Sequence, residues 1–297
     1  MLDEALRARI ENSIGDALGE AVRVRSAEAA GGGSISEAFV VGDGTRRWFV
    51  KVNRAALAPM FDAEADGLAA LAQCGAIRVP KVIAQGVEGA HAFLVLEHLA
   101  LRPLRERGDG AAAGEALAAL HRIEGTQHGW PRNNFIGRNP QDNAMHVTWP
   151  FFFAHHRLRP QLEMAKSRED SRRLIERGEK LADRLAAFFV DYRPKASLLH
   201  GDLWNGNAAV DENGRLALFD PAVYFGDRDA DLAMSELFGG FPESFYVAYR
   251  AAWPLAPGYE QRKTLYNLYH VLNHLNLFGG GYLRQAERMV EALLAEL

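Results

Sequence analysis

The periodicity of apolar and polar residues changes near residue 99 and divides the chain into two parts. Residues 1–20 carry apolar positions at helical spacing, which predicts an opening amphipathic helix. Short alternating segments follow, separated by glycine turns, and such alternation is typical of strands. We therefore expect five strands and one further helix before residue 99. The strands are expected at residues 21–30, 35–44, 46–53, 78–83 and 92–99, and the helix at residues 61–75.

Helical periodicity dominates the remainder of the chain. A charged segment broken by proline and glycine, residues 101–110, is expected to connect the two parts. Residues 125–160 are polar and aromatic, and a connection of this length is more often functional than idle. Helices are expected at residues 114–123, 173–189, 263–278 and 282–297, and short strands around residues 208–210 and 216–219. The expected fold class is α+β, with a small antiparallel sheet lobe at residues 1–98 and a mostly helical lobe at residues 99–297.

Composition narrows the function classes only a little. The chain has 297 residues and a net charge of −4, with no long basic run, so a general nucleic-acid binder is disfavoured. Cys74 is the only cysteine, which excludes an internal disulfide and a cysteine-based zinc site. The N-terminal residues lack a signal-peptide pattern, and no apolar run is long enough to span a bilayer. We expect a cytoplasmic protein that binds neither nucleic acid nor membranes.

The stretch HGDLWNGN, residues 200–207, gathers polar groups directly after an apolar pair. It contains Asp202 and Asn207 in the order D-x-x-x-x-N, and Asp220 follows the next apolar strand. A hairpin between these strands would bring the three side chains together. Oxygens of Asn207 and Asp220 suit Mg²⁺, and Asp202 could accept a proton from an attacking hydroxyl, as in kinase-like phosphoryl transfer. The alternative is that these residues only cap and tie a loop.

A glycine turn and a strand lysine suggest a phosphate site in the first part. Glycine-rich turns expose backbone N–H groups that can approach phosphates. Lys51 lies in a following strand, and Glu64 on the next helix could hold its ammonium group in place. A P-loop sequence is absent, which disfavours a P-loop NTPase. The turn residues expected to contact the nucleotide are Gly32, Gly33 and Ser34.

Other polar residues are expected to support these sites. Backbone groups of Glu97 and Leu99, where the strand 92–99 ends, could bind an adenine edge, although a plain buried strand would show the same residues. His200 is interpreted as a packed anchor of the loop and not as the base. Asp231 is expected to accept backbone N–H bonds from that loop. Asp227 and Asp229 are interpreted as an acidic cluster at a helix N-terminus, favoured by the helix dipole.

These motifs together resemble the fructosamine kinase, or ketosamine 3-kinase, family. The resemblance rests on LLHGDLWNGN, on LALFDPAVYFGDRDADLAM and on GGGSISEAF, with FVKVN, LEHL and NNFIG in support. It implies a bilobal protein-kinase-like fold and ATP-dependent phosphorylation of the 3-hydroxyl of a sugar joined to an amine. It also implies Asp202 as base, Asn207 and Asp220 as Mg²⁺ ligands, and Lys51 with Glu64 as the ion pair that holds the phosphates.

The acceptor side is less defined by sequence. Trp204 could stack on a sugar face or wedge the loop against the second lobe. Asn134 and Phe135 could line the acceptor pocket or only fold the long segment 125–160. An alternative is a kinase of the aminoglycoside or choline kinase type that acts on another alcohol, and a further alternative is a non-catalytic nucleotide-binding module. The sequence leaves the oligomeric state and the free or protein-bound form of the acceptor open.

Overall fold

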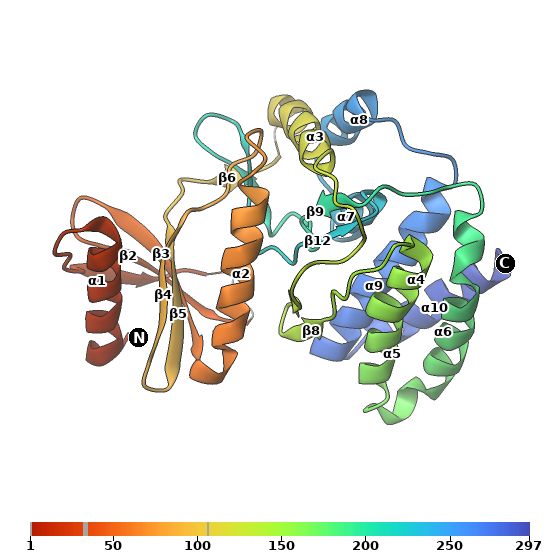
Figure 1. Ribbon diagram of the computed structural model, residues 1–297, viewed down its shortest axis with the longest axis horizontal. Coiled ribbons are helices and arrows are strands. Elements are labelled where there is room, and N and C mark those ends of the chain that lie inside the picture. The colour runs from red at the N-terminus through yellow and green to blue at the C-terminus, as the bar shows by residue number, and fades with distance from the viewer. Residues whose placement is uncertain (1, 32–34, 106) are drawn as a thin grey trace.

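The computed structural model describes residues 2–31, 35–105 and 107–297, and these form two lobes joined near residue 99 (Figure 1). The N-terminal lobe contains a five-stranded antiparallel sheet in the order β1-β2-β3-β5-β4. Its strands are β1 Ser26–Ala29, β2 Glu37–Gly42, β3 Arg47–Arg54, β4 Val82–Glu88 and β5 His91–Glu97. Its helices are α1 Glu4–Leu18 and α2 Ala58–Leu71, with the short 3-10 helix η1 Ala55–Leu57 between β3 and α2.

The two faces of this sheet are covered by different helices. Figure 1 shows α1 on the outer face and α2 between the sheet and the second lobe. The alternation along β5 explains this arrangement, because successive side chains of a strand point to opposite faces. Phe93 and Val95 pack with α1, whereas Leu94 and Leu96 belong to the core that contains α2. The predicted lobe of five strands and one helix after the opening helix is therefore confirmed.

One strand prediction is displaced. The fourth strand runs over β4 Val82–Glu88 and not over residues 78–83. Arg78 instead bridges to the second lobe, with its N–H donating to Leu216 O (2.7 Å) and its carbonyl accepting from Leu218 N (2.9 Å). Pro80 has no N–H to give to a ladder, and β4 begins only after it.

The C-terminal lobe is mainly helical, with short strand pairs around its loops. Its helices are α3 Arg107–His121, α4 Trp149–Phe153, α5 Arg159–Ala165, α6 Arg172–Arg184, α7 Asp229–Leu237, α8 Glu243–Ala252, α9 Tyr259–Phe278 and α10 Tyr282–Ala295. Its strands are β6 Arg102–Pro103, β7 Asn134–Ile136, β8 Asn139–Gln141, β9 Ser197–Leu199, β10 Ala208–Val210, β11 Leu216–Leu218 and β12 Tyr224–Gly226. Shorter helical turns are η2 Ala154–Leu158, η3 Glu169–Ser171 and η4 Leu185–Phe189.

The expected connector at residues 101–110 already belongs to the C-terminal lobe. β6 pairs with β10 there, and Leu104 is buried in the core. The helix predicted from residue 114 begins earlier, since α3 starts at Arg107.

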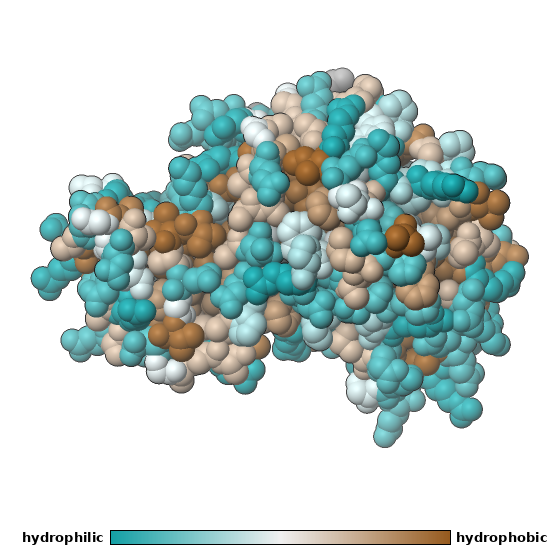
Figure 2. Space-filling view, viewed as in Figure 1, coloured by the Kyte–Doolittle hydropathy of each residue, from teal (hydrophilic) through white to brown (hydrophobic). Residues whose placement is uncertain are grey.

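The buried apolar side chains of the described residues form three cores. One joins α2 and the inner face of the sheet to α3, β10, β11 and α8, so it spans both lobes. A second lies under α1, and a third is built from α4 to α6, α9 and α10. Figure 2 shows apolar side chains only as separate patches on one face of the molecule. Among the described residues, no helix is long and apolar enough to cross a membrane.

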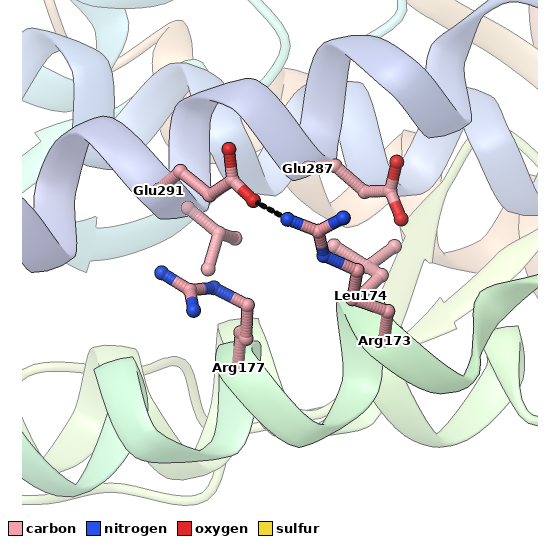
Figure 3. A pocket seen from close by; sticks show the side chains of 6 residues that line it. Arg173, Leu174, Arg177, Glu287 and Glu291 are labelled. Atoms are coloured by element: carbon pink, nitrogen blue, oxygen red, sulfur yellow. Dashed lines mark hydrogen bonds and ion pairs between the residues drawn. The ribbon is translucent and has the colours of Figure 1, made fainter.

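The α6–α10 contact is a closed seam. Leu174 of α6 and Val290 of α10 are buried, and Arg173 forms an ion pair with Glu291 above them (Figure 3). Packing of this kind joins α6 to α10 within the apolar core of the C-terminal lobe.

Candidate active site

The loop between β9 and β10 carries the polar motif, and His200 anchors it. The His200 side chain is fully buried, and its Nε2 lies 3.0 Å from Phe219 O. Its Nδ1 accepts a hydrogen bond from the Asp202 backbone N–H (3.2 Å). Burial lowers the pKa of His200. The geometry agrees with the predicted anchor, since both ring nitrogens are engaged by backbone groups.

Asp231 holds the backbone of the same loop through its carboxylate. Its carboxylate accepts hydrogen bonds from His200 N (2.7 Å) and from Gly201 N (2.9 Å), as predicted. Burial would raise the pKa of Asp231, but His121 and the other donors hold it below its ordinary value. A buried carboxylate thus sets the backbone immediately before Asp202.

Asp202 faces the cleft beside Asn207. The Asn207 Nδ2 group donates to Asp202 Oδ2 (3.0 Å) and to Asp202 O (2.9 Å). Burial and then the nearby charge of Asp220 raise the pKa of Asp202 to about 7. A carboxyl with a pKa near neutrality is suited to accept a proton in catalysis.

Asp220 reaches the same place from the end of β11. The β10–β11 hairpin pairs Ala208 with Leu218, and Phe219 N donates to Asn207 O (3.2 Å). Asp220 has a positive φ of +57°. No other non-glycine residue in the described ranges has a positive φ. A left-handed aspartate is uncommon, and such backbone conformations cluster at functional sites.

The donor set of Asn207 and Asp220 fits a magnesium ion. Because Asn207 Nδ2 is committed to Asp202, its Oδ1 is the side-chain atom left for a cation. The Asp220 side chain is 47% exposed, so its carboxylate is open to the cleft. His, Cys, Asp and Glu form no group of three that could hold a metal anywhere in the described ranges. Two protein oxygens are nevertheless what Mg²⁺ takes when phosphates and water complete its shell.

Lys51 joins the two lobes electrostatically. Its Nζ lies 2.6 Å from Glu64 Oε1 and 2.5 Å from Asp220 Oδ1. Burial alone would lower the pKa of Lys51, but the carboxylates of Asp220 and Glu64 outweigh it and raise the pKa. Burial raises the pKa of Glu64, opposed by Lys51. The arrangement holds an ammonium group, charged at neutral pH, at the wall of the cleft between the lobes.

The cleft between the lobes has a volume of about 720 Å³, which lies within the size range of small-molecule sites. It brings together most of the residues singled out from sequence. These are Lys51, Glu64, Glu97, Leu99, Asn134, Phe135, Asp202, Trp204, Asn207 and Asp220. The predicted nucleotide contacts Gly32, Gly33 and Ser34 lie outside the described residues.

Sequence reasoning missed Asn53, which supports the chain after the glycine turn. Its Nδ2 donates to Ile35 O (3.1 Å) and Ser36 Oγ (3.0 Å). The available signal was its position in β3, two residues after Lys51 and therefore on the same face of the strand.

Glu97, which is expected to contact an adenine edge, already has partners for its backbone N–H and its carboxylate. Its N–H donates to Lys81 O (2.8 Å), and its carboxylate pairs with Arg78. Its carbonyl is then the Glu97 backbone group available to a ligand, together with the backbone of Leu99. Binding of an adenine edge by the backbone of Glu97 and Leu99 stays a prediction, with the Glu97 carbonyl as the group involved.

The three residues singled out for the acceptor side differ in whether their side chains are already engaged by other residues. Trp204 lines the cleft and packs edge-on against Phe238, with ring centroids 6.2 Å apart. Phe135 also lines the cleft. Asn134 is buried, donates to Val223 O (2.8 Å) and accepts from both Gln141 and Asn143. The structure therefore favours the loop-folding alternative for Asn134.

The interpretation of Asp227 and Asp229 as a cluster stabilised by the helix dipole is incomplete. Asp229 is the first residue of α7, but both side chains are buried. Asp229 pairs with Arg262 (2.8 Å), and Asp227 accepts from Tyr192 and Tyr266. Buried carboxylates need such partners, because a helix dipole alone is too weak to offset their desolvation.

The chain is similar to known proteins over almost its whole length. A sequence profile of the fructosamine kinase family matches residues 6–296. The chain belongs to the fructosamine kinase family. It is 43% identical over 289 residues to a protein of Synechocystis sp. assigned as a ketoamine kinase, covering 96% of each chain. It is 36% identical to the chloroplastic protein-ribulosamine 3-kinase of Arabidopsis thaliana, covering 94% of this chain and 86% of the relative.

Solved structures agree with this family assignment. A crystal structure of a protein from Haemophilus somnus assigned as a fructosamine-3-kinase superimposes with a TM-score of 0.88 at 30% identity, covering 96% of both chains. An aminoglycoside phosphotransferase in ternary complex with AMP-PNP and hygromycin B superimposes with a TM-score of 0.63 at 16% identity, covering 96% of this chain and 97% of that one. The second likeness shows the fold alone. The predicted protein-kinase-like α+β fold is thus confirmed, and the chain is a kinase.

Proposed function

We propose that this kinase transfers the γ-phosphoryl group of ATP to the 3-hydroxyl of ketosamines, which are sugars joined to amines by glycation and rearrangement. The observation that carries the proposal is the convergence of Lys51, Asp202, Asn207 and Asp220 on one cleft. Membership of the fructosamine kinase family, and a protein-ribulosamine 3-kinase among its relatives, support the choice of acceptor.

In this proposal the division between residues 1–98 and 99–297 separates two tasks. The N-terminal lobe binds the nucleotide, with Lys51 directed to its phosphates and Glu64 holding Lys51. The backbone of Glu97 and Leu99 contacts the adenine edge. The C-terminal lobe supplies the base and the acceptor surface, where Trp204 and Phe135 face the cleft.

Asp202 is the proposed general base. As the 3-hydroxyl oxygen forms its bond to the γ-phosphorus, the hydroxyl proton passes to the Asp202 carboxylate, and the bond to the leaving oxygen of ADP breaks. Asn207 orients the carboxylate through its Nδ2 hydrogen bond. Lys51 offsets negative charge on the phosphates. The products are the 3-phosphorylated ketosamine and ADP.

Asn207 Oδ1 and the Asp220 carboxylate would hold Mg²⁺ bound to the nucleotide. When bound, this cation would neutralise charge on the phosphate oxygens. Asp220 also pairs with Lys51, so one side chain aligns the metal position with the ammonium group.

The test is ADP release from Mg·ATP across a panel of acceptors. Ribulosamine and fructosamine adducts, both free and on protein lysines, should support turnover, and Asp202→Asn should abolish most of it. The same panel contains an aminoglycoside and choline. Turnover with either of these and none with any ketosamine would replace the proposed acceptor, and nucleotide binding without turnover on the whole panel would replace catalysis by a binding role.

A further inference from the structure

A side-chain hydrogen bond joins α2 of the N-terminal lobe to the C-terminal lobe. The indole Nε1 of Trp130 donates to Asp66 Oδ2 across 2.7 Å. Asp66 lies on α2, two residues after Glu64, and Trp130 lies in the long segment between α3 and β7. Both side chains are half-buried. A hydrogen bond to a carboxylate is stronger than one between neutral groups, so this contact is among the more stabilising ones an indole can make.

Trp130 is held firmly on the C-terminal lobe. Its backbone N–H donates to Asn143 O (3.0 Å), and its ring packs against Phe225 with centroids 5.3 Å apart. The preceding residue, Gly129, exchanges two backbone hydrogen bonds with Phe225, of 2.9 and 2.8 Å. The indole N–H is therefore held in a fixed position by contacts of residues 129 and 130 with β12 and Asn143.

The α2 helix also touches the segment that follows Asp220. A Cβ on Gly67 would lie 3.0 Å from Pro221 Cγ and 3.4 Å from Val223. Glycine at this position lets α2 approach the C-terminal lobe closely. Asp66 and Gly67 are neighbours, so the hydrogen bond and the close contact act on the same turn of the helix.

We propose that Trp130 and Asp66 are positioning residues that fix α2, so that Glu64 holds Lys51 against Asp220 before any ligand binds. The inference rests on the proposed role of Lys51 in phosphate binding. It gives Trp130, which takes no part in the proposed chemistry, a defined role. The 2.6 Å Lys51–Glu64 contact would then be kept by a permanent bond to the other lobe and not by a separate activating event.

Variants at the two positions separate this bond from simple core packing. Trp130→Phe keeps an aromatic ring on Phe225 and removes the donor, while Asp66→Ala removes the acceptor from a half-buried position. Asp66→Asn keeps an acceptor oxygen and should recover most of what Asp66→Ala loses. Asp62→Ala is the matched control, because Asp62 lies one turn earlier on α2 and accepts a hydrogen bond from Gln85 within the N-terminal lobe (2.9 Å).

The primary readout is the affinity for Mg·AMP-PNP, measured by titration calorimetry without an acceptor. Trp130→Phe and Asp66→Ala should each weaken binding roughly 5- to 20-fold, as expected for loss of one charge-assisted hydrogen bond at a half-buried site. The double variant should be no weaker than either single one. Hydrogen exchange of the α2 amides should become faster in both variants and stay unchanged in Asp62→Ala, with melting temperatures close to that of the unmodified protein.

The proposal is overturned if Trp130→Phe and Asp66→Ala, both folded, bind Mg·AMP-PNP like Asp62→Ala and protect α2 equally. Packing alone would then hold the helix. Because the binding measurement uses no acceptor, failure of the proposed ketosamine activity would show only in the turnover assay. The two outcomes are therefore distinguishable.

Discussion

The side chain of Asn207 donates one hydrogen bond to the carboxylate of Asp202 and a second to its main-chain oxygen. The two contacts commit both N–H groups of the amide and close the loop of residues 202–207 on itself. They also orient the remaining amide oxygen away from Asp202, which is a carboxylate and would repel it. One residue thus positions the proposed base and offers a ligand to the proposed cation.

Asp202→Asn should lower kcat by about 10²- to 10⁴-fold, because the amide has no basic oxygen to take the acceptor proton. The substitution keeps the size of the side chain and an oxygen that can accept from Asn207. Affinity for Mg·AMP-PNP should therefore stay near that of the unmodified protein. Steady-state ADP release and calorimetry measure the two quantities. Asp183→Asn, an exposed partner of Arg159, serves as the control. Full activity in Asp202→Asn would remove the assigned base.

Asp220→Asn should raise the Mg²⁺ concentration needed for half-maximal activity by at least roughly tenfold. Loss of a residue that merely supports a metal ligand already costs about 10- to 100-fold in metal affinity. Asparagine tolerates the left-handed backbone at φ +57°, so this variant removes charge without adding strain. Asp220→Ala should lose more, since it adds backbone strain to the lost ligand. An unchanged Mg²⁺ dependence in Asp220→Asn would place the cation elsewhere.

Gly201→Ala should destabilise the protein by more than about 3 kcal/mol or prevent folding. Gly201 has φ +82°, and a Cβ there would lie 2.0 Å from Ala222 O. Neither backbone can move freely, because Asp231 holds Gly201 N and His200 O accepts from Ala222 N. Urea denaturation measures the change. Gly75→Ala is the control, since no described atom beyond its two chain neighbours lies within 4 Å of the added methyl group. Equal stability of the two variants would show that the loop can rearrange.

The arrangement of the polar side chains at the site could be predicted from sequence because it is encoded locally. Asp202 and Asn207 lie five residues apart on one loop, and Asp220 follows the next strand, so a single hairpin suffices to bring them together. The role of His200 as an anchor was also predictable, because its place beside an apolar pair indicates burial. Such inferences need no knowledge of how the lobes pack.

Features that depend on packing between distant elements could not be predicted. The glycines near the start of α3 look like helix breakers, yet the helix includes them because α8 lies against it. A Cβ on Gly114 would come within 2.2 Å of Phe245 O. The bond between Asp66 and Trp130 joins residues 64 positions apart, and neither residue belongs to a recognisable motif. For Asn134 the sequence leaves both a ligand contact and a loop-folding role open, because it does not show the partners Gln141 and Asn143.

His128 makes the stability of the protein depend on pH below neutrality. Its ring packs on Trp149 with centroids 5.2 Å apart, and its buried Nδ1 has no hydrogen-bond partner in the part of the chain that the structure describes. Burial, with a smaller effect of His146, lowers the pKa of His128 from 6.5 to about 4. Between these two pH values the unfolded chain binds a proton at this residue and the folded chain does not. The neutral His128 therefore costs no free energy of unfolding above about pH 6.5. Between pH 6.5 and 4 its contribution lowers the free energy of unfolding by up to ~1.4 kcal/mol per pH unit.

His128→Phe should flatten this dependence, because phenylalanine keeps the ring contact with Trp149 and cannot bind a proton. The backbone hydrogen bonds between residues 128 and 146 do not involve the side chain and should persist. Urea unfolding at pH 7.5, 6, 5 and 4.5 measures the free energy of unfolding in the variant and the unmodified protein. The difference between them should grow in favour of the variant as the pH falls. His91→Phe, at a partly exposed strand end, should retain the original slope. Parallel curves for His128→Phe and the unmodified protein would mean that His128 can be protonated in the folded state.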